Sequence, residues 1–388
     1  MSYATKFYFA NALRGLAALA VLVDHYGGGF WFFREQVAAF ANSPVLNAVE
    51  KPMPLYLSVL WPTPHVQWGG FGVALFFLIS GFVIPISLQR YDVRGFLLGR
   101  VLRIYPTYVV CFSITILTLF VTTLMYGSTF PYALREVLIH YVPGLRDLMW
   151  SRFIDGIVWT LEIELKFYLL CALIAPLVRG GSLWTFTAPV VLGSVAVWVN
   201  SRLPGLGTDA DAAYQTAILV SANGQMLCFM FIGTALYFRT RGWLGPDQTI
   251  AIIVLLFGLF VLAFSQGAYA SVFIRAWSYG AALFLFALAL AYQQWSGWQN
   301  RLLSFFADIS YPLYAVHGVL GFVMIRGLIG LGVKVWLTLA ITTTVAVSLA
   351  WIIHRFVELP THRIGQRLGR KWSPHERLTG SELTAPAE

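Results

Sequence analysis

The chain has 388 residues and a formal net charge of +9, and 58% of its residues are hydrophobic while only 11% are charged. A soluble domain carries roughly 25% charged residues, so the composition places this chain among membrane proteins. It also argues against nucleic-acid binding, because no basic face outside the apolar segments is large enough to form a footprint.

Apolar runs recur along the whole sequence, and each is long enough to cross a hydrocarbon core of about 30 Å. Arg14 lies within the first run and no small-residue cleavage pattern follows it, which indicates a retained helix rather than a removed signal peptide. The predicted fold class is an all-α, polytopic membrane protein. We expect about ten transmembrane helices, at residues 7–27, 70–89, 104–126, 157–178, 184–200, 215–238, 250–266, 270–293, 308–330 and 333–355.

The distribution of Lys and Arg predicts the orientation. These residues concentrate in cytoplasmic loops, and the segments on the side of the N-terminus carry the larger share of them. We therefore expect both termini in the cytoplasm and a multi-pass protein of the cell (inner) membrane, surrounded by the lipid bilayer. Residues 1–360 are predicted to form the membrane domain, and residues 361–388 a basic and then disordered cytoplasmic tail.

The first run carries polar residues that lipid disfavours. Arg14 and His25 are eleven residues apart, which on an α-helix puts them on one face with a rise of about 16 Å. Intramembrane ionisable residues indicate a functional path, although a snorkelling Arg and a helix-terminal His remain alternatives. Asp24 points about 100° away from His25 and is expected to be a local hydrogen-bonding or capping group.

The second and third runs suggest packing and anion binding, respectively. Ser80-Gly81 lies in the middle of the second run, where small residues favour close helix packing. Arg100 and Arg103, on the cytoplasmic approach to the third run, are three residues apart and share a face. Such a pair can bind a phosphate bidentately or pair with a structural carboxylate.

The fourth run, which includes "WTLEIELKF", has a carboxylate without a local partner. Glu162 and Lys166 are spaced to neutralise one another, whereas Glu164 has no such partner in its own helix. Trp159 and Glu164 are expected in the outer half of the membrane. We expect Glu164 to orient the ring of His25 and to stabilise its imidazolium form.

The last two runs add further candidates. Ser310, Tyr314 and His317 follow at i, i+4 and i+7 and share one helix face. Glu358 lies at the cytoplasmic end of the last run, where a structural ion pair is the main alternative to a functional role. The histidines show no paired ligand spacing, so no metal is expected.

Six blocks of this sequence together resemble acyltransferase family 3, the integral-membrane acyltransferases that modify polysaccharides and other extracytoplasmic acceptors. They follow one another in the family's order: Arg14-x10-His25, "FFLISGFVI" at 76–84, Arg100-x-x-Arg103-Ile-Tyr-Pro, "WTLEIE" at 159–164, "SYPLYAVH" at 310–317 and "VELP" at 357–360. The sequence departs from the family at Leu165-Lys166, where acidic or amide residues are frequent.

The resemblance implies an acyl-CoA donor, commonly acetyl-CoA, used from the cytoplasm, and an acceptor hydroxyl on the far side of the membrane. It implies that Arg14 and His25 are essential, and it carries the Arg-x-x-Arg motif to Arg100 and Arg103. No bound cofactor is implied beyond this co-substrate. The chain ends too early for the soluble esterase-like domain of some members, so transfer would be completed by the membrane domain or by a separate polysaccharide-synthesis partner.

The predicted function is therefore the transfer of an acyl group, expected to be acetyl, from cytoplasmic acyl-CoA to a hydroxyl of an extracytoplasmic polysaccharide or glycan. His25 would be a general base or a transient acyl carrier. Glu164 is the second catalytic candidate, and the predicted binding residues are Arg14, Arg100, Arg103, Trp159, Tyr314 and His317. Asp24, Ser310 and Glu358 are predicted to support the site.

Three other functions fit parts of this pattern. A carrier or flippase for a glycan or an anionic substrate would also have intramembrane Arg, Glu and His, but it predicts inverted repeats and interrupted helix pairs, which the sequence does not show. An unrelated membrane-bound acyltransferase built around one intramembrane His would lack the Arg-containing blocks. A structural partner in polysaccharide synthesis would tolerate the loss of His25.

Overall fold

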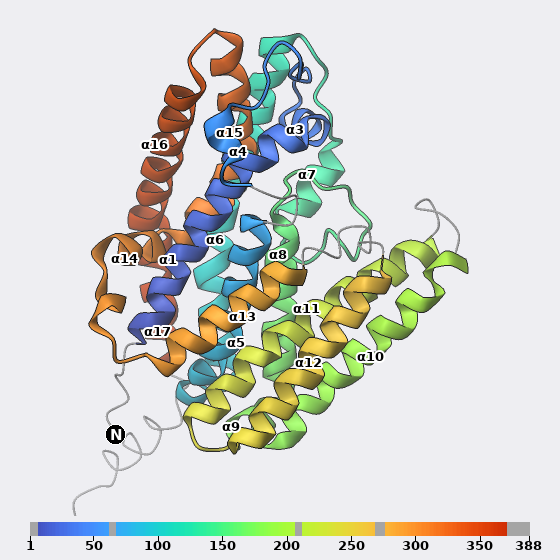
Figure 1. Ribbon diagram of the computed structural model, residues 1–388, viewed down its shortest axis with the longest axis vertical. Helices are drawn as coiled ribbons and strands as arrows, with labels where there is room; N and C mark the ends of the chain where they lie inside the picture. The colour runs from blue at the N-terminus through green and yellow to red at the C-terminus, as the bar shows by residue number, and fades with distance from the viewer. Residues whose placement is uncertain (1–6, 62–66, 206–211, 268–275, 371–388) are drawn as a thin grey trace, which may run out of the picture. The chain divides into compact units, whose positions relative to one another are not determined.

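The computed structural model describes residues 7–61, 67–205, 212–267 and 276–370, and the regular structure in these residues is helical throughout. Figure 1 shows the long helices and the short ones that connect them. The predicted all-α fold class is confirmed.

Seven helices in the described residues are long and apolar enough to cross a membrane, and an eighth is added if a bent pair counts as one span. The bent pair joins the helical stretch Tyr8–Phe32 to α3 (Arg34–Ala41) at an angle of 108°. The other seven are α5 (Trp68–Arg90), α6 (Val93–Tyr126), η2 with α10 (Leu183–Phe186, Thr187–Arg202), α11 (Ala212–Thr240), α12 (Pro246–Gln266), α15 (Ser310–Gly330) and α16 (Val335–Ile353) with its continuation to Gly369.

Each of the ten predicted runs overlaps a described helix, and the described residues contain seven or eight candidate spans against about ten predicted. α8 (Val158–Leu173) has 16 residues, which at 1.5 Å per residue is about 24 Å, less than the hydrocarbon core. α13 (Ala276–Ala291) begins directly after residues that lie outside the described ranges. The location of both termini in the cytoplasm remains a prediction.

Shorter helices complete the described chain. They are α4 (Leu55–Ser58), α7 (Leu134–His140), α9 (Ala175–Arg179), η3 (Leu203–Gly205), η5 (Ser296–Gln299), α14 (Arg301–Asp308), η6 (His354–Glu358) and α17 (Leu359–Arg370). α17 makes the first part of the predicted tail helical, and residues 371–388 lie outside the described residues.

The contacts divide the chain into two compact units, each assembled from separate stretches of sequence. Unit 1 comprises Met1–Phe76, Pro106–Leu161 and Trp277–Glu358. Unit 2 comprises Phe77–Tyr105, Glu162–Ala276 and Leu359–Glu388. Each unit is described by its own contacts below.

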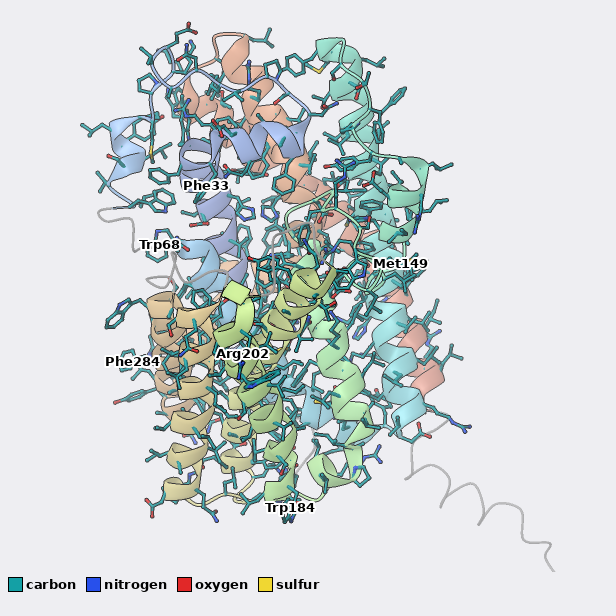
Figure 2. All side chains as sticks on the ribbon, turned by 90° about the vertical axis from the view of Figure 1, so that its right-hand side faces the viewer. Phe33, Trp68, Met149, Trp184, Arg202 and Phe284 are labelled. Atoms are coloured by element: carbon teal, nitrogen blue, oxygen red, sulfur yellow. The ribbon has the colours of Figure 1, made fainter. Side chains whose placement is uncertain are left out.

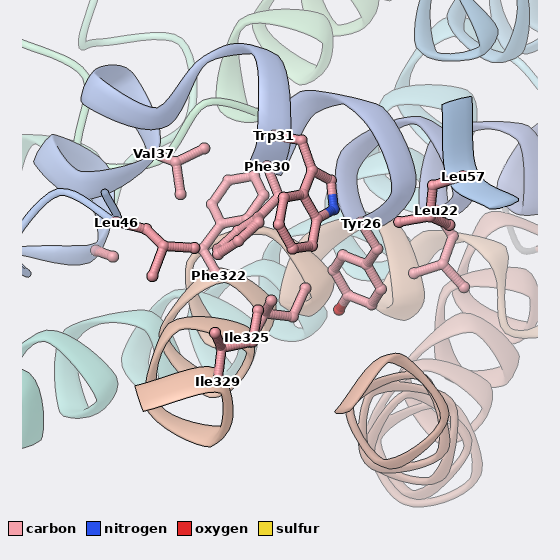
Figure 3. Close-up of a cluster of buried hydrophobic side chains, with 11 residues drawn as sticks. Leu22, Tyr26, Phe30, Trp31, Val37, Leu46, Leu57, Phe322, Ile325 and Ile329 are labelled. Atoms are coloured by element: carbon pink, nitrogen blue, oxygen red, sulfur yellow. The ribbon is translucent and has the colours of Figure 1, made fainter. Parts of the chain in front are cut away.

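Unit 1 packs the first helical stretch against α14 and α15. Gly15 of α1 (Tyr8–Val23) lies so close to α14 that a β-carbon there would be 2.1 Å from the carbonyl oxygen of Leu303. Only a glycine permits this approach without a backbone shift. Figure 3 shows the apolar cluster beyond it, where Phe30 and Trp31 pack with Phe322 and Ile325 of α15. This packing fixes α15 beside the first span.

Unit 2 contains the bundle of α10, α11 and α12, which lie side by side in Figure 1. α5 joins α11 closely, because a β-carbon on Gly81 would be 1.9 Å from the carbonyl oxygen of Met230. Trp184, at one end of the bundle in Figure 2, is 72% exposed, and Trp198 of α10 is 61% exposed. Outward aromatic side chains of this kind suit contact with a bilayer.

Candidate active site

A π-helical segment follows α1 and contains His25. The helix continues without interruption into η1 (Asp24–Gly29), with the sequence DHYGGG. π turns are rare and are frequent at functional sites. The backbone therefore distinguishes this position independently of the residue type.

The imidazole rings of His25 and His317 form a pair within unit 1. Nδ1 of His25 lies 2.7 Å from Nε2 of His317 of α15, and the ring planes are 20° from parallel. His317 is only 1% exposed, whereas His25 is half-buried. His25 is therefore the more exposed member of the pair.

Backbone carbonyls determine where the protons of this pair lie. Nδ1 of His317 is 2.9 Å from the carbonyl oxygens of both Leu313 and Tyr314. Because a carbonyl only accepts, Nδ1 of neutral His317 carries the proton and its Nε2 carries the lone pair. Nδ1 of His25 then donates to that lone pair, which leaves the lone pair of His25 on Nε2. This is the atom that a general base or a nucleophile uses.

Further contacts fix the rotation of α15 about its axis. The hydroxyl of Tyr26 donates to the carbonyl oxygen of His317 at 2.9 Å. The hydroxyl of Thr160 donates to that of Tyr314 at 2.9 Å, and Phe76 packs edge-on against the Tyr314 ring. Tyr314, predicted to bind substrate, thus also helps to hold the helix that carries His317.

A second polar cluster lies in unit 2 and combines charges of opposite sign. Oε1 of Glu164 accepts hydrogen bonds from the hydroxyl of Ser80, at 2.8 Å, and from the hydroxyl of Tyr168. The guanidinium of Arg100 lies 5.5 Å from the ring centroid of Tyr168 and donates to the hydroxyl of Ser87 at 2.6 Å. The Arg-x-x-Arg motif and the acidic motif of α8 therefore meet through Tyr168.

Asp155 caps the start of α8, the helix that carries Trp159 and Glu164. Its Oδ1 accepts hydrogen bonds from the backbone N–H groups of Ile157 and Val158, at 3.2 and 2.9 Å. Burial raises the pKa of Asp155 to about 6, and these two hydrogen bonds oppose the shift without cancelling it. Asp155 was not predicted, although a carboxylate three residues before a helix is a recognisable capping signal.

The remaining predicted residues lie in several places. Arg14 is within α1, and Asp24 lies against Gly69 at the start of α5. The hydroxyl of Ser310 donates to the carbonyl oxygen of Ala307 at 2.8 Å, where α14 gives way to α15. Oε2 of Glu358 is 2.7 Å from Nδ1 of His354, both in the π-helical η6.

His25 and Glu164 have neighbours that the sequence analysis did not name. Nδ1 of His25 bonds to His317, and Glu164 bonds to Ser80 and Tyr168. Pairing of Glu164 with His25 stays a prediction. The sequence reasoning missed the His25–His317 pair, since no pattern links two residues 292 positions apart. It also missed Tyr168, for which its spacing of four residues after Glu164 was an available signal.

Within the described ranges, no group of three or more His, Cys, Asp or Glu side chains is arranged to hold a metal ion. The chemistry available to the described residues is that of a neutral imidazole pair, a carboxylate and an arginine. Such groups can transfer protons, carry an acyl group and bind an anion.

The helices and the histidine pair define an α-helical membrane protein suited to proton or group transfer. The model of acyltransferase family 3, described as an acyltransferase domain, matches residues 7–355, and the chain therefore belongs to this family. It is 29% identical to acyltransferase MdmB of Streptomyces mycarofaciens, over 93% of this chain and 92% of that protein. No solved structure matches the chain.

Proposed function

We propose that this membrane acyltransferase transfers an acetyl group from cytoplasmic acetyl-CoA to a hydroxyl group of an extracytoplasmic polysaccharide or glycan. The observation that carries the proposal is the His25–His317 pair, which presents the lone pair of His25 on Nε2 at a half-buried position. Membership of the acyltransferase family supports the reaction class.

In the direct route, Nε2 of His25 removes the proton of the acceptor hydroxyl. The oxygen attacks the thioester carbonyl, the C–S bond breaks, and the leaving thiolate takes the proton from His25. The products are an ester and free coenzyme A. His317 holds the ring of His25 through its Nδ1–H and stabilises the imidazolium that forms in between.

In the alternative route, Nε2 of His25 attacks the thioester itself, releases the coenzyme A thiolate and carries the acyl group. The acceptor hydroxyl then attacks that acyl group, the acyl–nitrogen bond breaks, and the hydroxyl proton goes to the thiolate. Both routes use the same nitrogen. The pair of rings supports either, because it fixes the tautomer and the orientation of His25 rather than the order of the steps.

The donor is bound in this proposal by arginine residues. Arg100 and Arg103 bind phosphates of acyl-CoA, for which a guanidinium has matching geometry. Arg14 binds the thioester carbonyl or another phosphate, and Trp159 contacts the donor. Polysaccharide-synthesis proteins would supply the acceptor on the outer side.

The test compares the wild-type protein with His25→Ala after reconstitution into liposomes at equal folded amounts. We expect the wild type to consume acetyl-CoA and to acetylate added polysaccharide, with the product identified by mass spectrometry. His25→Ala should lose activity by at least about 10³-fold. His362→Gln, in α17, is the matched control and should retain activity.

Equal activity of the wild type and His25→Ala would exclude His25 as the catalyst. Polysaccharide moved across the liposome membrane without acylation would instead favour a carrier.

A further inference from the structure

Tyr168 contacts both charged residues of the cluster in unit 2. Its hydroxyl donates to Oε1 of Glu164, one helical turn earlier in α8. Its ring lies 5.5 Å from the guanidinium carbon of Arg100 and packs edge-on against Phe96, which is itself 5.5 Å from that carbon. One neutral side chain thus separates an anion from a cation.

This separation is unusual for a carboxylate and a guanidinium that interact electrostatically. Glu164 and Arg100 interact electrostatically, and a direct ion pair with bidentate geometry would be the expected outcome for such residues away from water. Instead, Glu164 accepts hydrogen bonds from the hydroxyl groups of Ser80 and Tyr168, and Arg100 donates to the hydroxyl of Ser87 and also interacts with that of Tyr168. Among the described residues, no carboxylate forms an ion pair with Arg100.

The consequence concerns the donors of the guanidinium. An arginine has five N–H donors, and aromatic rings attract its charge through their faces without accepting conventional hydrogen bonds. The two rings and the hydroxyl groups of Ser87 and Tyr168 therefore hold Arg100 in position, and its remaining N–H donors can bind an incoming anion. A direct bond to Glu164 would use two of them and cancel the charge.

We propose that Tyr168 is a positioning residue for the acyl donor: it keeps Glu164 from pairing with Arg100, so that Arg100 can bind a phosphate group of coenzyme A. This inference rests on the proposed function, in which Arg100 binds that phosphate. The ring of Tyr168 orients the guanidinium, and the hydroxyl occupies the carboxylate that would otherwise compete with the phosphate.

Tyr168→Phe tests the role of the hydroxyl, because it retains the ring that packs on Phe96 and Arg100. Without the hydroxyl, Glu164 loses one of its two hydrogen-bond donors and is expected to form an ion pair with the guanidinium of Arg100. We expect the dissociation constant of coenzyme A, measured by titration calorimetry on the purified full-length protein, to rise about tenfold. Tyr237→Phe, a buried tyrosine of the same unit, is the matched control and should bind as the wild type does.

The double variant Tyr168→Phe/Glu164→Gln distinguishes positioning from a merely structural role. A neutral amide does not compete with the phosphate for Arg100, so coenzyme A binding should return to within about twofold of Glu164→Gln alone. Binding is measured rather than turnover, because Glu164 is itself a catalytic candidate.

Unchanged binding in Tyr168→Phe would overturn the inference and leave the proposed function intact. Weakened binding that the double variant does not restore would also overturn it, because the tyrosine would then act through packing alone. A wild-type protein that does not bind coenzyme A would refute the proposed donor and this inference with it.

Discussion

The polar side chains of the two candidate clusters are arranged in opposite ways in the two units of the molecule. In unit 1, His25 and His317 are two neutral rings of the same kind, and the carbonyl oxygens of Leu313 and Tyr314 determine where each proton lies. In unit 2, Glu164 and Arg100 carry opposite charges, and Tyr168 lies between them. The first arrangement fixes protons, and the second keeps charges apart.

The difference indicates that the two clusters have separate roles, proton transfer in unit 1 and anion binding in unit 2. A ring pair with a defined tautomer can accept and return a proton without moving, which is the requirement for catalysis of an acyl transfer. An arginine held by aromatic rings offers hydrogen-bond donors to an anion, which is the requirement for binding. Substitutions in the first cluster should therefore change kcat, and those in the second should change donor affinity.

The largest expected effect comes from His317. His317→Phe retains a ring but removes the lone pair that accepts from His25, so His25 loses the partner that fixes its tautomer. We expect kcat to fall by about 10²–10⁴-fold while KM for acetyl-CoA stays within about threefold. A rise in KM with unchanged kcat would assign His317 to donor binding and would refute the separation of roles between the two clusters. Folding is checked by size-exclusion chromatography in detergent.

A pH effect on stability is expected from Asp155 in unit 1. Burial raises its pKa in the folded protein to about 6, above its ordinary value of 3.8. Its contribution to folding is therefore complete below about pH 4 and is lost as the pH rises through 6, a change of about 3 kcal/mol. Asp155→Asn should reduce the difference between thermal unfolding at pH 5 and at pH 7.5.

Asp247→Asn, at the exposed start of α12 in unit 2, is the control for that measurement and should leave the pH difference unchanged. An undiminished pH dependence in Asp155→Asn would show that another group is responsible.

The close helix contacts should be equally sensitive in both units. Gly15→Ala in unit 1 and Gly81→Ala in unit 2 each place a β-carbon against a carbonyl oxygen, at 2.1 and 1.9 Å, so the helices must separate. We expect each to cost about 1–3 kcal/mol of stability. Gly258→Ala in α12, where a β-carbon would meet nothing within 4 Å, should not destabilise. The measurement is thermal unfolding in detergent. Equal unfolding temperatures of the three variants would contradict the expectation.

The smallest expected effect is the loss of donor affinity in Arg100→Lys. Lysine keeps the charge but lacks the planar group that the rings of Phe96 and Tyr168 hold. We expect KM for acetyl-CoA to rise about fivefold to tenfold and kcat to change little. Arg94→Lys, at the start of the same helix, is the control. A fall in kcat with unchanged KM would place Arg100 in the chemical step.

Local patterns predicted much of the fold. Each long apolar run became a helix, because apolar side chains and the need to satisfy backbone groups in a membrane leave little alternative. The short helix α8 is not among the candidate spans, since helix ends depend on caps such as Asp155 and not on hydropathy alone. His25, His317, Glu164 and Arg100 were all recognisable as polar residues in apolar surroundings.

The sequence by itself determined the membrane class, the helical architecture and the residue types of both clusters, because composition and spacing act over a few turns of one helix. Only the tertiary structure decided which residues meet. His25 and His317 are separated by 292 positions, and Tyr168 reaches Arg100 from a different helix. Such pairs depend on how helices pack and rotate against one another, as at Gly15 and Leu303, and periodicity along one helix carries no information about that packing.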